Sequence, residues 1–474
     1  MTEQEKGQII KSIVLSIFDE EGPTPKIYWP DDMEENARLL IAMKTISLLM
    51  GDETYQDGED LNINYFGILP FPDLKLSGLT YFFLIADEKA RGQAKAATIT
   101  VLIEDDNKSF FHENMKYLRV LIDKAATKVQ HATQLNVEDE YKSVIDEIRK
   151  QLIDFCRDLK DPLSSKRKIK IVYTGLDRAG KTSFLLAVKK KYSEIIKTLP
   201  TKGVERSEEK VFDEQNSQMT IWDLGGQKKY REKYLEQSKY YLYNIDLLFY
   251  VIDIQDSKER LDESLNLFIR IIKSLKELDE FPPIVVCLNK FDPDLKDSED
   301  INKNAQHATK EINRNSDKFF VKIFRTSIFD YWSLISAYSF GLSQLSPNRE
   351  FFRKQLKFFA NKTNSDALLL LNENGIILSN YSKNEISRKV FEISAPHFQT
   401  LYKTFKEFKL LKEDFIVSSG ITTETKNVIF KRIKVDKYNL YLLLFIEEYL
   451  GIEIIDQHLP DFSKTLVDLI STYI

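Results

Sequence analysis

One short loop between a predicted strand and a predicted helix restricts the fold of this chain more than any other feature. A run of β-branched and apolar residues, Ile169–Thr174, leads into the sequence GLDRAGKTS at 175–183, and an amphipathic helix begins at Lys181. In this context the N–H groups of the loop and the N-terminus of the helix converge on one anion. Gly175 and Gly180 supply the backbone freedom that the loop needs. The pattern predicts a phosphate loop in an α/β domain, with a mostly parallel sheet covered by helices on both faces.

The side chains of this loop have different expected roles. Lys181 is placed to reach the β- and γ-phosphates of a nucleotide, and the Thr182 hydroxyl is placed to join a Mg²⁺ coordination shell. The other predicted nucleotide contacts of the loop are Gly175, Asp177, Arg178, Ala179, Gly180 and Ser183.

Two further segments supply groups for a third phosphate. The sequence TIWDLGGQ ends a predicted strand with Asp223, which is placed to hold Mg²⁺ through water. The Gly226 N–H is placed to donate to a γ-phosphate, and Gln227 to orient an attacking water. In TLPTKGVE, Thr201 would complete the metal shell only when the γ-phosphate is present. The predicted catalytic residues are Gln227, Lys181 and Thr201, and the predicted metal ligands are Thr182, Thr201 and Asp223.

A segment that follows the apolar strand PIVVC identifies the base. It reads LNKFD, and its Asp292 carboxylate can accept hydrogen bonds from N1–H and the N2 amino group of guanine, whereas adenine has neither donor there. Asn289 would contact N7 and brace the phosphate loop, and the stem of Lys290 would cover the face of the base. In the later sequence RTSIFD, Ser327 and Ile328 are further predicted contacts, and the Ile328 N–H would meet guanine O6. These residues favour GTP and GDP as ligands.

Together these motifs resemble the G domain of the Ras superfamily of small GTPases over residues 166–347. GLDRAGKTS, TLPTKGVE and WDLGGQ are similar to the Arf family, whereas FRTSIFDYWSLISAYSFGLSQLSPN is similar to the end of the G domain in Rag/Gtr GTPases. The chain looks like an archaeal-type Rag/Gtr-like or Arf-related GTPase. The resemblance implies Mg²⁺ as cofactor and hydrolysis of GTP to GDP and phosphate.

The segments on either side of this domain are predicted to be small α+β modules. Residues 1–130 show the order strand, strand, helix, three strands, helix, which resembles a longin domain. Residues 350–474 show helix, two strands, helix, three strands, helix, which resembles a roadblock domain. Both resemblances imply profilin-like folds. A charged helix within 131–165 would connect the first two domains, either packed on a neighbouring domain or, alternatively, as a coiled-coil partner helix.

Composition argues against several other functions. The net charge of −5 argues against a nucleic-acid partner, because a protein that binds nucleic acid needs a cationic surplus or a basic patch. Two cysteines cannot form a disulfide framework or a zinc site, and the histidines form no spaced ligand cluster, so Mg²⁺ is the only metal expected. The sequence shows no signal peptide, membrane span or lipidation motif. We therefore expect a cytoplasmic protein that reaches membranes only through partners.

Two functions are compatible with the sequence. The first is a slow GTP-hydrolysing switch, in trafficking or signalling, that recruits or releases protein partners according to its nucleotide. The second is a nucleotide-stabilised scaffold with negligible turnover. Gln227 and Thr201 favour the switch. Two features keep the scaffold hypothesis in play. Asp177 would crowd the γ-phosphate, and Arg206 lies past Thr201, where it is not placed to act in cis.

The resemblance also implies protein partners, namely activating factors, exchange factors and effectors. Roadblock domains pair by extending their sheets and stacking long helices. The last block carries aromatic residues at helical spacing, among them Phe391, Phe398, Tyr402 and Phe405. We therefore expect a homodimer, or a heterodimer with a related GTPase, formed through the C-terminal domain.

Overall fold

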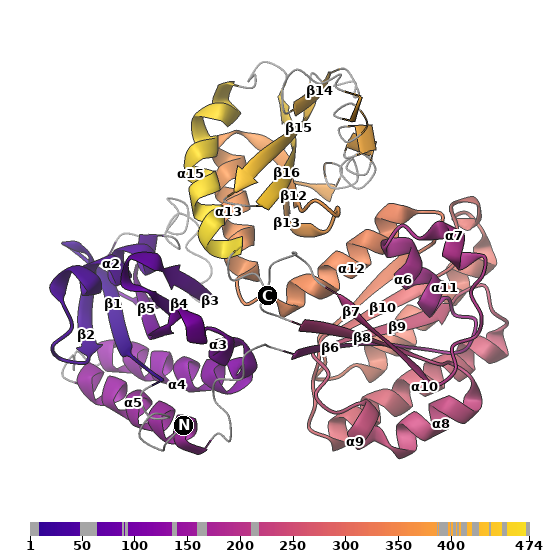
Figure 1. The fold of residues 1–474 in the computed structure, drawn as a ribbon, viewed down its shortest axis with the longest axis horizontal. Coiled ribbons are helices and arrows are strands. Elements are labelled where there is room, and N and C mark those ends of the chain that lie inside the picture. Colours follow the sequence, from indigo (N-terminus) through magenta and orange to yellow (C-terminus); the bar gives the residue numbers. More distant parts are fainter. Residues whose placement is uncertain are drawn as a thin grey trace.

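The computed structural model of this chain contains three β-sheets, each in its own lobe (Figure 1). The residues it describes are 9–47, 64–87, 90, 93–134, 140–158, 168–209, 218–385, 387, 397–398, 400–401, 404, 407–408, 415–419, 426–435, 438–447 and 453–470. Within these ranges, no helix is long and apolar enough to cross a membrane.

The first lobe is an antiparallel sheet with helices on both faces. Its strands are β1 (Ser12–Asp19), β2 (Gly22–Trp29), β3 (Tyr65–Phe71), β4 (Leu76–Ala86) and β5 (Ala94–Glu104), in the order β2-β1-β5-β4-β3. Its helices are α2 (Glu35–Ser47), α3 (Ser109–Glu113), α4 (Met115–Gln134) and α5 (Glu140–Asp158). Alternate residues of each strand face opposite sides, so Val14 packs in the core beneath α2 whereas Ile13 packs in the core shared with α4 and α5.

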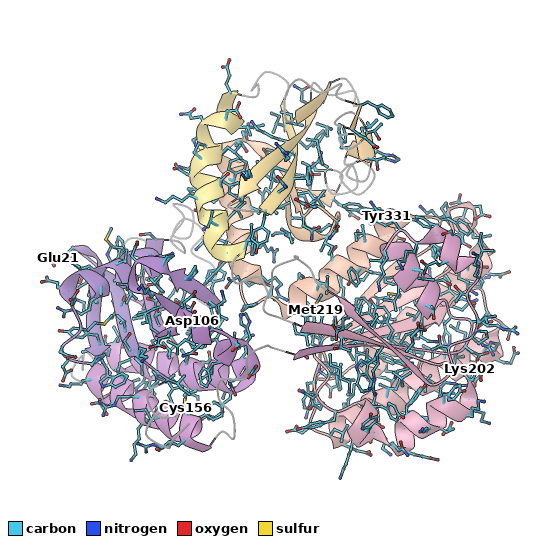
Figure 2. The ribbon with its side chains drawn as sticks, in the orientation of Figure 1. Glu21, Asp106, Cys156, Lys202, Met219 and Tyr331 are labelled. Carbon is cyan, nitrogen blue, oxygen red and sulfur yellow. The ribbon has the colours of Figure 1, made fainter. Side chains whose placement is uncertain are left out.

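The helix α5 lies within the region predicted to be a connector. Its buried stripe includes Ile148, Leu152 and Cys156, and it packs with α4 into the core of the first lobe (Figure 2). Residues 135–139 and 159–165 of the predicted connector lie outside the described residues.

The central lobe is a six-stranded sheet that is parallel except at one end. Its strands are β6 (Lys168–Thr174), β7 (Val204–Glu209), β8 (Gln218–Leu224), β9 (Leu247–Asp253), β10 (Ile284–Asn289) and β11 (Val321–Thr326), in the order β11-β10-β9-β6-β8-β7. Only β7 runs antiparallel to its neighbour. Every residue of β9 is buried, because helices cover both faces of the sheet.

Seven helices surround this sheet within the described residues. They are α6 (Lys181–Val188), α7 (Tyr192–Ile195), α8 (Lys228–Glu236), α9 (Ser238–Tyr241), α10 (Lys258–Glu277), α11 (Glu299–Asn315) and α12 (Tyr331–Leu345). Leu247, Phe249 and Val251 of β9 pack with α6 and α12, whereas Leu248 and Tyr250 pack with α10 and α11. The structure therefore has the predicted fold class, a central α/β domain between two α+β domains.

The third lobe has the same strand order as the first. Its strands are β12 (Ser365–Leu371), β13 (Ile377–Ser382), β14 (Phe415–Ser419), β15 (Lys426–Val435) and β16 (Tyr438–Glu447), in the order β13-β12-β16-β15-β14. The helices α13 (Arg349–Lys362) and α15 (Glu453–Ile470) lie side by side, with the rings of Phe359 and Phe462 stacked 4.3 Å apart. Of the aromatic residues predicted on a helix here, Phe398 is buried, whereas Phe391, Tyr402 and Phe405 lie outside the described residues.

One asparagine joins the first lobe to the rest of the chain. Asn348 is fully buried between α12 and α13. Its Oδ1 accepts from the Ile68 N–H at 2.8 Å, and its Nδ2 donates to the Ile68 carbonyl at 2.9 Å. Because β3 is an end strand of its sheet, this amide takes the place of a neighbouring strand. A Cβ at Gly67 would overlap the Phe351 ring, so the glycine permits this close approach.

A half-buried lysine with a buried ammonium nitrogen lies at the same junction. Lys354 of α13 lies over the rings of Tyr65 and Phe82, with its Nζ 4.9 Å and 5.3 Å from their centroids. Burial lowers the pKa of Lys354 to about 7, and the nearby Lys357 acts in the same direction. The faces of the two rings attract a cation, so they offset part of the free-energy cost of burying the charged ammonium group.

We expect Asn348→Ala to loosen the first lobe from α13. The change leaves the N–H and C=O of Ile68 without these partners, at a cost of about 1–3 kcal/mol for each buried group. Hydrogen exchange of the Tyr65–Phe71 segment should become faster, and the midpoint of urea unfolding should fall. Lys362→Ala, at an exposed position at the end of the same helix, is the control and should change neither. Equal exchange in both variants would contradict this role of Asn348.

Candidate nucleotide site

The predicted site residues gather at one edge of the central sheet. They lie in loops at the carboxyl ends of β6, β8, β10 and β11, and in the segment before β7. Figure 2 shows this edge near Lys202, whereas Met219 at the beginning of β8 lies on the side facing the first lobe. The carboxyl edge is where open parallel sheets bind ligands.

The phosphate loop has the conformation that its glycines permit. Gly175 has a φ of 142° and Gly180, which precedes α6, has a φ of 91°. A Cβ at Gly175 would overlap the Val251 carbonyl oxygen, and a Cβ at Gly180 would overlap the side chain of Asn289. Arg178 also has a positive φ, and its side chain is exposed. Ala179 is buried beneath the loop.

Lys181 is held inside this loop. Its Nζ donates to the carbonyl of Leu176 at 2.7 Å and to that of Gly175 at 3.1 Å. Burial lowers the pKa of Lys181 to about 8, although Asp223 and Asp177 favour its charged form. An ammonium group in such a low-dielectric setting interacts strongly with a phosphate.

Three oxygen-bearing side chains from separate segments meet next to the loop. The Thr182 hydroxyl donates to Asp223 Oδ2 at 2.5 Å, and Thr201 Oγ1 lies 3.1 Å from Thr182 Oγ1 and 3.4 Å from Asp223 Oδ2. Burial raises the pKa of Asp223, and its Oδ1 is buried without a partner in the described structure. Two hydroxyls beside a carboxylate with an unpaired oxygen fit a hard divalent cation such as Mg²⁺. Within the described ranges, no group of three or more His, Cys, Asp and Glu side chains is arranged so that it could hold a metal ion. Ser183 follows Thr182 in the first turn of α6.

The segment around Gly226 lies directly against the phosphate loop. The Asp177 N–H donates to the Gly226 carbonyl at 3.1 Å, and a Cβ at Gly226 would overlap the backbone of Leu176 and Asp177. Gln227 caps α8, and its side chain is partly exposed. The predicted third-phosphate residues are thus brought together at one point.

The two segments that carry Thr201 and Gly226 are also linked to each other. The Gly225 N–H donates to the Gly203 carbonyl at 2.8 Å, and the Tyr234 hydroxyl donates to the same carbonyl at 2.7 Å. Because of these hydrogen bonds, a movement of the segment that carries Thr201 would also disturb the segment that carries Gly226.

The predicted base-binding residues lie at the ends of β10 and β11. Asp292 Oδ1 accepts from the Ser327 hydroxyl at 2.5 Å, and Oδ2 accepts from Gln255 Nε2 at 2.9 Å. Asn289 Nδ2 donates to the Ala179 carbonyl at 2.8 Å, which is the predicted brace of the phosphate loop. Gln255, which sequence reasoning missed, follows β9 on the same edge of the sheet.

The remaining base-side residues are held by neighbouring strands and helices. Lys290 pairs with Asp253 at the end of β9. The Ser327 N–H donates to the Ser333 hydroxyl of α12 at 3.1 Å, and Ile328 packs against the core. Phe329 is 74% exposed.

Sequence reasoning also missed an arginine at the phosphate loop. Arg260 in the first turn of α10 donates through Nη2 to the Asp177 carbonyl at 3.0 Å, and the same Nη2 lies 3.5 Å from the Asp177 carboxylate. The Nε of the same guanidinium donates to Asp256 Oδ2 at 3.1 Å. No local motif marks Arg260, because its contact joins residues far apart in sequence. Arg206, by contrast, lies over the Trp222 ring at 4.0 Å.

Comparisons with known proteins match the region of the chain that carries this site. Residues 170–398 match the family model described as the Gtr1/RagA G protein conserved region. ADP-ribosylation factor-like protein 14 of Mus musculus is 34% identical over 157 residues, which are 33% of this chain and 76% of that protein. ADP-ribosylation factor F of Dictyostelium discoideum is 28% identical over 149 residues, which are 31% of this chain and 73% of that protein.

The structure of the Arl6 BBS3 small GTPase from Trypanosoma brucei, with the bound nucleotide analogue GppNp, is a solved structure similar to this chain. The match covers 38% of this chain and 97% of that one, at 21% identity and a TM-score of 0.29.

We expect Arg260→Ala to weaken the binding of a nucleoside triphosphate more than that of a diphosphate. The change removes the cation next to the Asp177 carboxylate, so more negative charge faces a third phosphate. Hydrogen bonds to charged groups contribute about 1.5–3 kcal/mol, so the loss should be roughly tenfold or more. Fluorescent GDP and a non-hydrolysable GTP analogue give the two dissociation constants. Arg270→Ala is the matched control, because Arg270 lies on the same helix as Arg260 but pairs with Glu232 of α8. An equal loss for both nucleotides would contradict the prediction.

Proposed function

Because the chain belongs to the Ras superfamily of small GTPases, related to the Arf and Rag/Gtr branches, we propose that its GTPase domain is a slow switch controlled by protein partners. The family binds guanine nucleotides and hydrolyses GTP. In the proposed cycle, the chain recruits or releases partners in trafficking or signalling according to which nucleotide it holds.

The observation that carries this proposal is the meeting of Thr182, Thr201 and Asp223. They come from the phosphate loop, the segment before β7 and the end of β8. A switch needs contacts that exist with GTP and are lost with GDP, since a ligand shifts an equilibrium only through its differential affinity for the two states. In the proposal, the γ-phosphate and its metal ion bind next to Thr201 and the Gly226 segment and supply such contacts.

Each residue of the site has a proposed task. Lys181 binds the β- and γ-phosphates, the Gly226 N–H donates to the γ-phosphate, and Gln227 orients the attacking water. Mg²⁺, held by Thr182 and Thr201 and through water by Asp223, supplies positive charge for the phosphate oxygens. The base is recognised by Asp292, Asn289, Lys290, Ser327 and the Ile328 N–H.

A second candidate is a nucleotide-stabilised scaffold with negligible turnover. The observation that favours it is the position of Asp177, whose carboxylate lies beside the phosphate loop with Arg260 as counter-charge. The Arg206 guanidinium lies over the Trp222 ring and donates a hydrogen bond to the Tyr240 hydroxyl at 3.0 Å. Fast hydrolysis would then require an arginine from an activating partner, worth about 10³ to 10⁵ in rate in GTPases where it is supplied.

The flanking domains are proposed to hold the partners. Their shared strand order supports related folds, longin-like at residues 1–130 and roadblock-like at residues 350–474. We propose that the roadblock-like domain forms a homodimer or a heterodimer with a related GTPase. The chain would act in the cytoplasm and reach membranes through exchange factors, activating factors and effectors.

Hydrogen exchange distinguishes the switch from the scaffold. With a non-hydrolysable GTP analogue and Mg²⁺, the segments Leu199–Glu205 and Gly225–Glu232 should exchange more slowly than with GDP. Lys258–Glu277, the helix α10, serves as an internal reference. Identical exchange in both segments with the two nucleotides would make the scaffold the better account.

Gln227→Leu should separate binding from chemistry. Because Gln227 is proposed to hold water only during the chemical step, the variant should keep near-normal GTP affinity and lose most of its hydrolysis. Removing one donor that stabilises charge in a transition state costs about 10²–10³ in rate, and a loss of similar size is expected here. Single-turnover hydrolysis and nucleotide affinity are measured together. Gln237→Leu, at the end of the same helix, is the matched control. Unchanged hydrolysis in Gln227→Leu would exclude this role.

A further inference from the structure

A cavity of about 490 Å³ lies between the central and third lobes. Its walls come from β11 and α12 on one side and from α13, β12 and β13 on the other, and α12 packs directly on β13 (Figure 1). Its volume falls within the range of about 300–1,000 Å³ that is usual for small-molecule sites, which often form between domains. It does not overlap the nucleotide residues described above.

Most of the wall is apolar. The rings of Phe324 and Phe340 are tilted against each other, with centroids 5.4 Å apart, and Phe320 stacks on Phe340 with centroids 6.1 Å apart. Leu369 and Leu378 face them from the third lobe. Phe320 remains 54% exposed. These side chains suit the hydrocarbon or aromatic body of a ligand.

Two residues that line the cavity each carry a buried polar atom without a partner in the described structure. The atoms are Nε1 of Trp332 and Oγ of Ser336. The two residues stand four positions apart on α12, so they lie on the same face of that helix. Indole N–H is a donor only, and the serine hydroxyl can donate as well. The pair therefore suits a ligand atom group that accepts hydrogen bonds.

The charged residues of the cavity have a cationic excess. Lys322, Arg349 and Arg353 line it together with one carboxylate, Glu350, which pairs with Arg349 at 2.8 Å. Lys322 and Arg353 are exposed, and neither has a carboxylate partner in the described ranges. A ligand with negative charge is therefore favoured over a neutral one.

We propose that this cavity binds an amphipathic organic anion, with its carboxylate at Trp332 and Ser336 and its apolar body against Phe324 and Phe340, and that the bound anion slows nucleotide release. The slowing of nucleotide release rests on the proposed function. A chain of contacts leads from the cavity to the base site, because Ser333 in the same turn as Trp332 accepts from the Ser327 N–H, and the Ser327 hydroxyl donates to Asp292. An anion that fixes the first turn of α12 would fix Ser327 and Asp292 with it.

Binding is tested on the full chain with decanoate, which has both the apolar body and the carboxylate. Calorimetry should give saturable binding of decanoate. Acetate, which lacks the body, and decanol, which lacks the charge, should each bind at least about tenfold more weakly, because each loses one part of the recognition. Equal binding of decanol and decanoate, or no saturable binding of decanoate, would overturn the proposal.

Variants locate the site. Trp332→Phe combined with Ser336→Ala removes both donors while an aromatic ring stays at position 332, and Arg353→Glu reverses one charge. Each should weaken decanoate binding about tenfold or more. Lys310→Glu, at an exposed position on α11, is the matched charge reversal and should leave it unchanged. Because Ser336→Ala alone is a mild change, its effect remains interpretable if the double variant proves unstable. Decanoate affinity unchanged in Ser336→Ala and in Arg353→Glu would overturn the site.

The release of fluorescent GDP tests the coupling. Decanoate should slow release about threefold or more in the wild-type chain and have no effect in the Ser336→Ala or Arg353→Glu variants. Decanoate binding with unchanged GDP release would overturn the coupling. A chain that binds decanoate but no guanine nucleotide would contradict the proposed function while supporting the cavity as a binding site.

Discussion

The amide of Asn289 fixes the position of the phosphate loop relative to the base-side residues of the nucleotide site. Its Nδ2 donates to the Ala179 carbonyl in the phosphate loop, and its Oδ1 accepts from the Thr326 hydroxyl at the end of β11. The residue is 2% exposed, so both groups are removed from water and an unmade bond there would be costly. Gly180 is required next to it, because a Cβ at that position would overlap this side chain. The distance between the phosphate and base regions is therefore set by one buried side chain, and the other contacts of the site are built on that spacing.

A second buried amide, that of Asn348, sets the position of the first lobe in the same way. The helix α12 connects the two regions, because it starts next to the base-side loop at Asp330 and ends just before Asn348. The same helix packs on β13 of the third lobe. A rotation of α12 would therefore act on the base loop, on the junction with the first lobe and on the third lobe together. This gives the proposed switch a physical route to both flanking domains.

Local sequence patterns were sufficient for the phosphate loop, the strand and helix on either side of it and the class of fold, because each pattern reports a local backbone requirement or the burial of a strand. They failed where structure depends on contacts between distant residues. Arg260 and Gln255 reach the site from segments with no motif, and Asn348 stands in an ordinary Ser-Pro-Asn sequence. From the sequence alone, the last helix is expected around residues 462–473, whereas α15 begins at Glu453. Pro460 lies inside it, and proline usually ends a helix, so the sequence favoured a later start.

Three arginines near the site are each bound to other groups, which is why hydrolysis would depend on a partner. Arg260 is bound to Asp177 and Asp256, Arg206 lies on Trp222, and Arg231 is buried in an ion pair with Glu263. Moving Arg260 toward a reacting phosphate would leave the Asp177 carboxylate uncompensated beside that phosphate, so negative charge would increase where the reaction needs it to decrease. Releasing Arg231 would leave a mostly buried cation without its carboxylate. An arginine brought by another protein carries neither cost, and its arrival can be regulated.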